Sequence, residues 1–186
     1  MKNFLLVFFL IFLTLNNCFA STHDQDHTNE LIKLFDKLSQ NKNIEEGDLL
    51  EKEIWAIWNK HPNKKSLTKK LEFGTMLMYE GQYDYALEVF TNVIRSDPYW
   101  SEAWNKRATL LYFMEDYQKS LSDIDKVLNL EPRHFGALSG RAQIYIKLEL
   151  YQKALQDLKD ARKIHPAIRG NELIKRIENL VNGQKI

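Results

Sequence analysis

A repeat of 34 residues runs without a gap through the sequence, at 67–100, 101–134 and 135–168. Its clearest markers are Pro98, Pro132 and Pro166. The same register holds for Tyr83, Tyr117 and Tyr151, for Leu87, Leu121 and Leu155, and for the small residues Gly74, Ala108 and Ala142. Repetition at a fixed period of this size is typical of solenoids, in which each unit packs only against its neighbours. This repeat constrains the fold more than any other feature of the chain.

Each unit is predicted to form two antiparallel helices. Apolar residues recur at helical spacing, and the whole chain holds only 4 Pro and 7 Gly, which leaves long stretches free of helix breakers. Short turns are expected at 80–82, 115–116 and 149–150. The small residue in each first helix lets the second helix approach closely, and the proline after the second helix cannot continue it. The expected fold class is therefore all-α.

The second unit carries a pattern of large and small residues at Trp104, Ala108, Leu111, Ser120, Ile124, Val127 and Pro132. This pattern resembles the tetratricopeptide repeat. The third unit departs from it at Leu138 and the first at Lys70, where that family favours tryptophan. The resemblance covers 67–168 and implies a right-handed superhelical solenoid of antiparallel helix pairs. The paired Trp55 and Trp58, with segments 104–109 and 131–140, further resemble small exported tetratricopeptide proteins of proteobacteria.

The flanks of the repeats are predicted to close the stack. Residues 31–64 fit the repeat frame weakly, because Leu38 and Leu50 stand where small residues belong, and we expect a degenerate N-terminal helix pair that caps the stack as a terminal repeat. Segment 169–186 is expected to hold an amphipathic capping helix over 171–181. Segment 21–30 has no apolar residue and is expected to be a disordered polar tail.

Residues 1–20 have the layout of a secretory signal. Lys2 is their only charge, an apolar run covers residues 4–15, and Cys18-Phe19-Ala20 offers small residues to a signal peptidase. Cleavage after Ala20 would give a periplasmic or secreted protein. Two alternatives stay open: an uncleaved anchor formed by residues 4–20, and a lipoprotein acylated at Cys18. A membrane partner is expected only in those two cases.

No residue constellation points to catalysis. The chain has 26 basic and 25 acidic residues, a balance that gives no case for nucleic-acid binding. Cys18 is the only cysteine, so cleavage would remove the one possible thiol ligand. His61, His134 and His165 are expected to bond helix ends at repeat junctions, and Asp123 and Asp125 point to different faces of one helix. We expect no enzyme activity, no cofactor and no metal, although His23 and His27 could hold a divalent ion weakly.

The resemblance places a binding groove on the concave face, lined by the first helix of each pair. By repeat register its residues are Leu71, Thr75, Met78, Tyr79, Asn105, Thr109, Tyr112, Phe113, Ser139, Gln143, Ile146 and Lys147. Three of these, Met78, Tyr112 and Ile146, could equally be core between repeats. Family members that grip a terminal carboxylate use basic and amide side chains where this chain has Leu71, Thr75, Gly136 and Gly140. Of the tryptophans, Trp100 alone is expected to be exposed.

These features predict a non-catalytic scaffold that binds an extended or helical segment of a protein partner in its groove. Met78 and the groove aromatics offer large adaptable contact area, and Asn105 and Gln143 offer amides to a peptide backbone. The alternative is a structural subunit of a cell-envelope complex that uses its convex face or its caps. The sequence does not name a partner.

Overall fold

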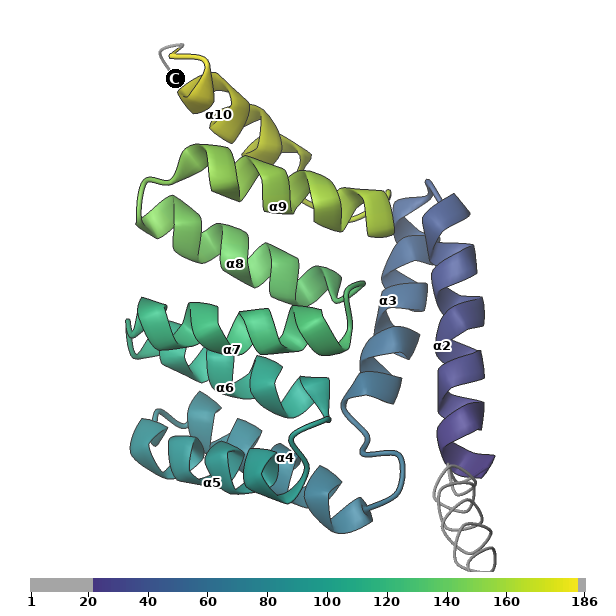
Figure 1. The fold of residues 1–186 in the computed structure, drawn as a ribbon. Helices are drawn as coiled ribbons and strands as arrows, with labels where there is room; N and C mark the ends of the chain where they lie inside the picture. Colours follow the sequence, from purple (N-terminus) through teal and green to yellow (C-terminus); the bar gives the residue numbers. More distant parts are fainter. Residues whose placement is uncertain (1–21, 184–186) are drawn as a thin grey trace, which may run out of the picture.

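The computed structural model describes residues 22–183, in which every regular element is an α-helix (Figure 1). The helices are α2 (Thr22–Gln40), α3 (Ile44–Trp58), α4 (Lys65–Tyr79), α5 (Tyr83–Ser96), α6 (Ser101–Phe113), α7 (Tyr117–Leu130), α8 (Phe135–Lys147), α9 (Tyr151–Ile164) and α10 (Asn171–Val181). The pairs α4–α5, α6–α7 and α8–α9 stack in sequence order, and α10 packs on α9. The all-α helical solenoid predicted from the repeat is confirmed.

The turn inside each pair has the same backbone geometry in all three repeats. Gly81, Glu115 and Glu149 occupy equivalent positions and have φ angles of 77°, 60° and 58°. In the first turn the Gly81 amide donates to Met78 O and the next amide donates to Leu77 O, which is a Schellman cap. Glycine adopts this left-handed conformation without steric cost, whereas glutamate does not.

We expect Glu115→Gly to raise the free energy of unfolding by up to about 1 kcal/mol. The variant removes the strain of a left-handed glutamate, which costs about 1–2 kcal/mol. Part of this gain in stability is offset, because glycine gives the unfolded chain more conformational freedom. Glu88→Gly, inside helix α5, is the matched control and should lower the free energy of unfolding by about 1 kcal/mol. Urea unfolding of both variants measures the difference, and a loss of stability in Glu115→Gly would contradict the strain argument.

Close packing inside the pairs depends on the small residues that keep the register. A Cβ atom added to Gly74 would lie 2.7 Å from Cε1 of Phe90, whose side chain is fully buried. Ala108 and Ala142 are also buried at the equivalent positions. The Ser120 hydroxyl, opposite Ala108, donates to the Ala108 carbonyl at 2.7 Å, so this buried polar group is satisfied.

An arginine ladder joins successive repeats. Arg107 of α6 donates to Asp123 of α7 at 2.7 and 2.9 Å, and to the Thr91 hydroxyl of α5 at 3.2 Å. The same bridge recurs 34 residues later between Arg141, Asp157 and Asp125. Asp123 and Asp125 therefore serve two different arginines, as expected for carboxylates on different faces of one helix. The first repeat lacks the ladder because Phe73 and Val89 stand at the equivalent positions.

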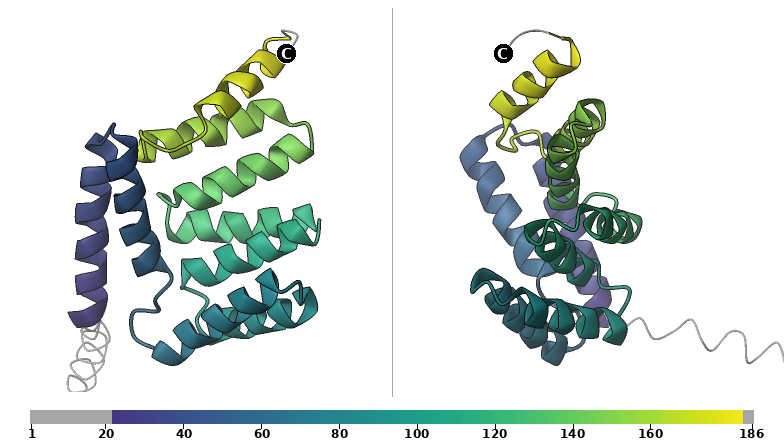
Figure 2. Two further views of the ribbon diagram at one scale, coloured as in Figure 1. Left: turned by 180° about the vertical axis from the view of Figure 1, so that it is seen from behind. Right: turned by 90° about the vertical axis from the view of Figure 1, so that its left-hand side faces the viewer.

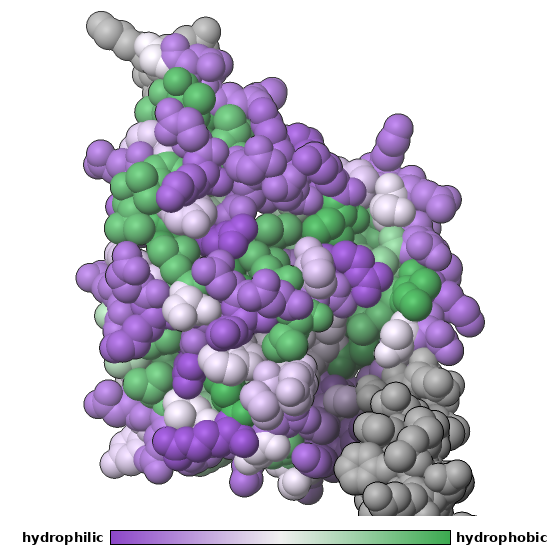
Figure 3. Space-filling view, in the orientation of Figure 1, coloured by the Kyte–Doolittle hydropathy of each residue, from purple (hydrophilic) through white to green (hydrophobic). Residues whose placement is uncertain are grey.

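Helices α2 and α3 form an N-terminal hairpin, but it does not stack on α4 as a further repeat. It runs across the ends of the repeat helices, beside the junctions 131–135 and 165–168 (Figures 1 and 2). Its buried residues Leu34, Phe35, Leu38, Leu50, Ile54 and Trp58 form one core with Phe135, Leu138 and Ala161. In Figure 3 apolar surface is visible along the seam between the hairpin and the repeats. The helix pair expected over 31–64 is present, but its expected place as a terminal repeat that caps the stack is wrong.

The bulk of the hairpin residues explains this placement. Trp58 stacks on His134 with ring centroids 4.1 Å apart, and Trp55 lies edge-on to the same ring. Leu38 and Leu50 stand where a stacked repeat needs small residues for close helix contact, and the aromatic side chains of the hairpin pack beside Phe135 instead. The Trp100 indole donates to the Trp58 carbonyl at 3.0 Å and is 7% exposed. The expectation that Trp100 is exposed is therefore wrong.

Helix α2 begins at Thr22, so the polar segment expected to be a disordered tail is helical from that residue onward. Leu34, Phe35 and Leu38 fix the C-terminal half of α2 against the repeats, and a helix that is already nucleated extends at little further cost. The signal features at residues 1–20 lie outside the described range. Over 22–183 no helix is both long and apolar enough to cross a membrane.

Candidate peptide-binding groove

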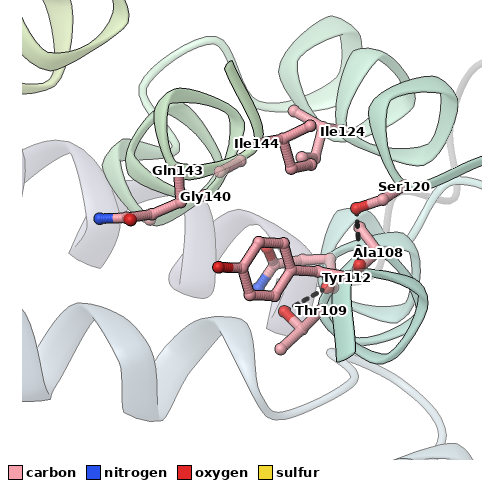
Figure 4. Close-up of a pocket in the computed structure, with 11 residues that line it drawn as sticks. Ala108, Thr109, Tyr112, Ser120, Ile124, Gly140, Gln143 and Ile144 are labelled. Atoms are coloured by element: carbon pink, nitrogen blue, oxygen red, sulfur yellow. Dashed lines mark hydrogen bonds between the residues drawn. The ribbon is translucent and has the colours of Figure 1, made fainter. Parts of the chain in front are cut away.

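The first helices of the second and third repeats enclose a small apolar pocket. Its volume is about 100 Å³, and Figure 4 shows it between α6, α7 and α8. The lining residues are Asn105, Ala108, Thr109, Tyr112, Ser120, Ile124, Gly136, Ala137, Gly140, Gln143 and Ile144. Small-molecule sites usually occupy roughly 300–1,000 Å³, so this pocket is sized for a single side chain rather than a whole ligand.

Four of the predicted groove residues line this pocket together: Asn105, Thr109, Tyr112 and Gln143. The pocket is also lined by Gly136, Ala137 and Gly140; sequence register named the two glycines only as positions without a carboxylate clamp and did not name Ala137. A Cβ atom added to Gly140 would have no neighbour within 4 Å, so the hollow continues directly over that residue. The sequence signal for this hollow was the pair Gly136 and Gly140, which lie four residues apart and therefore on one face of the helix.

The polar groups of the pocket are not equally free to bind. The Asn105 amide nitrogen donates to both carboxylate oxygens of Glu102, at 3.1 and 3.2 Å, and Asn105 is buried. The Thr109 hydroxyl donates to the Asn105 carbonyl. The Asn105 amide nitrogen is thus held within α6, and a bond from Asn105 to a peptide stays a prediction. Gln143 is exposed, and the Tyr112 ring lies at the pocket with its hydroxyl directed away from α6 (Figure 4).

The remaining predicted groove residues divide into core and surface. Leu71 and Met78 are buried in the core of the first repeat, so the alternative of a packing role is correct for Met78. Ile146 packs against the core under α10. The residues that reach solvent freely are Tyr79, Phe113 and Lys147, and Thr75 and Ser139 are partly exposed. The available surface is therefore narrower than the register predicts and centres on α6 and α8.

One end of the groove is closed by the N-terminal hairpin. A Cβ atom at Gly136 would lie 2.6 Å from Cζ2 of Trp55. Lys106 Nζ lies 5.7 Å from the centre of the Trp55 ring, so a cation also faces this indole. Gly136 is one of the positions where carboxylate-gripping relatives are expected to place a polar side chain. Trp55 fills that space here, which gives a steric reason for the missing clamp.

Glu102 is a buried charge at the centre of this region, and sequence analysis missed it. Besides Asn105, it contacts Lys106 Nζ at 3.0 Å and His134 Nε2 at 3.2 Å, and both Glu102 and His134 are fully buried. Burial acts to raise the pKa of Glu102, but the hydrogen bond to His134 and the charge of Lys106 outweigh it and lower the pKa overall. The repeat register offered a signal for Glu102, because the equivalent positions in the other two repeats hold the uncharged residues Thr68 and Gly136.

The junction histidines have structural roles. His134 Nδ1 accepts from the Ala137 amide and caps α8, so its other nitrogen carries the proton that faces Glu102. His61 Nδ1 accepts from the Asn63 and Lys64 amides, and its Nε2 lies 2.9 Å from Asp97. The helix-end role is confirmed for both. His165 is buried, and its Nε2 lies 3.3 Å from Glu51 without hydrogen-bond alignment, so the helix-end bond expected of its ring is not observed.

No cluster suited to a metal ion occurs among residues 22–183. His23 belongs to the start of α2, where side chains are not described, so the weak metal site at His23 and His27 stays a prediction.

Known proteins support the fold. Residues 101–134 match the family model described as a tetratricopeptide repeat, and no curated protein matches the sequence. The first repeat domain of Spaghetti (RPAP3) bound to an HSP90 peptide has a TM-score of 0.58 and 19% identity, covering 62% of this chain and 93% of that one. The Arabidopsis OM64 TPR domain has a TM-score of 0.58 and 18% identity, covering 62% and 96%.

A third similar structure is the yeast Sti1 TPR2B domain in complex with an Hsp70 peptide, with a TM-score of 0.51, 20% identity and coverage of 61% and 94%. At this identity the likeness shows the fold alone. The chain is therefore a helical solenoid of the tetratricopeptide type, with one repeat recognised by sequence at 101–134.

Proposed function

We propose that this protein is a non-catalytic adaptor that binds a segment of a partner protein through the pocket between α6 and α8. The observation that carries this proposal is the pocket itself: an apolar hollow over Gly140, with Tyr112 and Gln143 at its mouth. Apolar hollows bordered by aromatic rings are where interfaces concentrate binding energy. Solved structures with this fold include complexes with HSP90 and Hsp70 peptides.

The expected ligand presents one apolar side chain to the pocket rather than a terminal carboxylate. Gly136, which lies against Trp55, and Gly140, which borders the hollow, have no side chains, so neither position supplies a cation to bind a carboxylate. Gln143 is left to bond the backbone of the bound segment. Export to the cell envelope is part of this proposal and rests on residues 1–20, whose composition fits a signal peptide.

A photo-crosslinking residue at Gln143, compared with one at the exposed Ser122 of α7, first identifies the contacted segment in the native host. A synthetic copy of that segment is then titrated against purified protein. Gly140→Leu should weaken binding by about 100-fold, since leucine fills the hollow and removes the apolar anchor of the ligand. Folding should be preserved, because nothing lies within 4 Å of a Cβ at Gly140 and leucine favours a helix over glycine.

Ser122→Leu, which adds the same side chain away from the pocket, is the matched control and should bind as the native protein does. Binding that survives Gly140→Leu unchanged, with Tyr112→Ala and Gln143→Ala also unchanged, would exclude this pocket as the site. In that case the alternative gains support: a structural subunit that uses its convex face or caps. The hairpin that closes one end of the groove favours that alternative, because it leaves less groove for a partner.

A further inference from the structure

Among residues 22–183 no helix covers the outer face of α4, because the hairpin packs on the later repeats. We define this open face by Lys69, Phe73 and Met76 of α4 and by Glu80, the residue that caps its C-terminal end in helical backbone conformation; spacings of four, three and four place them on one side. Phe73 is 50% and Met76 46% exposed, and both charged residues are exposed. Helices α4 and α5 form the terminal layer of the stack (Figure 1).

The repeat register shows that this face is built to be covered. The equivalents of Met76 are Leu110 and Ile144, which are 0% and 1% exposed, and the equivalents of Lys69 are the buried Ala103 and Ala137. In the later repeats this side of the first helix packs against the second helix of the preceding repeat. For α4 the described chain supplies no such helix, since the hairpin packs on the later repeats instead.

The residues of the open face also differ in chemistry from their equivalents. Arg107 and Arg141 form ion pairs with Asp123 and Asp157 at the positions held here by Phe73 and Val89. The first repeat has thus an apolar pair where the other two have a charged pair. At the opposite end of the stack, α10 covers α9 with Ile174 and Ile177. Within the described part of the chain, one end of the solenoid is closed by α10, and the other exposes Phe73 and Met76.

We propose that the open face binds the open face of a second copy of this chain, so that two α4 helices cross antiparallel about a two-fold axis between Phe73 and Met76. Two-fold contacts require a self-complementary surface. Lys69 lies four residues before Phe73, and Glu80 lies four residues after Met76. The antiparallel crossing therefore places Lys69 of each protomer beside the partner's Glu80, and Phe73 beside the partner's Met76.

The charge pattern selects this occupant and this orientation. A parallel arrangement would bring Lys69 against Lys69 and Glu80 against Glu80, which is repulsive at both ends. The antiparallel arrangement forms two opposite-charge pairs around an apolar centre. Because one helix face from each copy covers less area than a standard interface of roughly 1,600 Å², we expect a reversible dimer with a dissociation constant in the micromolar range.

Sedimentation velocity of the purified protein over about 1–500 µM tests the proposal. The native protein should pass from monomer to dimer across this range. Lys69→Glu and Glu80→Lys alone should each weaken the dimer by roughly tenfold or more, because each places like charges together at both ends. The double variant Lys69→Glu/Glu80→Lys should restore native dimerisation, since it swaps the charges without changing the apolar centre.

Phe73→Ser/Met76→Ser should remain monomeric to the highest concentration, and circular dichroism of every variant should show native helix content. Tyr85→Ser is the matched control: it changes an aromatic residue of α5 that is 67% exposed and belongs neither to the open face nor to the groove, and it should dimerise normally. A native protein that stays monomeric, a dimer that persists in Phe73→Ser/Met76→Ser, or a charge swap that fails to restore association would each overturn the proposal. None of these outcomes depends on the pocket over Gly140.

Discussion

Glu102→Ala is expected to lower the free energy of unfolding by about 3–5 kcal/mol, the usual cost of removing one partner from a buried ion pair. Glu102 is fully buried and accepts hydrogen bonds from Asn105, Lys106 and His134. Alanine would leave the Lys106 ammonium largely buried without its counter-charge and the His134 ring without its acceptor. Urea unfolding of the purified variant measures the loss.

Glu102→Gln is the informative companion, since it keeps the shape and one acceptor but removes the charge. We expect it to lose less stability than Glu102→Ala. If alanine costs less than about 1 kcal/mol, the site must relax or admit water, and the argument for a buried charge fails.

The Glu102 carboxylate also makes the free energy of unfolding depend on pH. The pKa of Glu102 is lowered in the folded state from an ordinary value of 4.5. A lowered carboxyl pKa contributes stability above the unfolded pKa, and this contribution is lost as the pH falls through the folded pKa. The stability difference between the native protein and Glu102→Gln should therefore narrow as the pH is lowered below 4.5.

Trp58→Ala is expected to cost about 3–5 kcal/mol, because it empties the core that holds the hairpin on the repeats. The Trp58 side chain is 5% exposed, stacks on His134 and contacts Phe35 and Phe135. Its loss should release α2 and α3 before the repeats unfold. We expect hydrogen exchange in residues 27–58 to accelerate more than exchange in α4 and α5.

Phe113→Ala is the control for Trp58→Ala, as its ring is 45% exposed and its removal should change stability by less than about 1 kcal/mol. If Trp58→Ala accelerates exchange uniformly along the chain, the hairpin and the repeats form one cooperative unit, which would contradict separate release.

The repeats could be predicted because their information is local and repeated three times. Gly74, Ala108 and Ala142 must be small for the helices of each pair to touch, and the sequence shows this requirement once in every repeat. The turns at Gly81, Glu115 and Glu149 follow from the same register, although sequence did not reveal the left-handed strain in the two glutamates.

The candidate site could be predicted only in outline. Register placed Asn105, Tyr112 and Gln143 on one face, and the structure brings them together in one pocket. It could not show that Glu102 is fully buried beside His134, which lies 32 residues further along the chain, while it holds the neighbouring Asn105 amide. Nor could it show that Trp55 lies against Gly136, two residues more than 80 positions apart.

The sequence by itself determined the helix pairs, their order and the close contacts inside each repeat, since these involve residues within one 34-residue period. Only the tertiary structure decided where the N-terminal hairpin lies. The spacing of its apolar residues predicts a helix pair but not the surface that the pair covers, which depends on contacts with distant residues such as His134 and Phe135. That placement closes one end of the groove and leaves the outer face of α4 open.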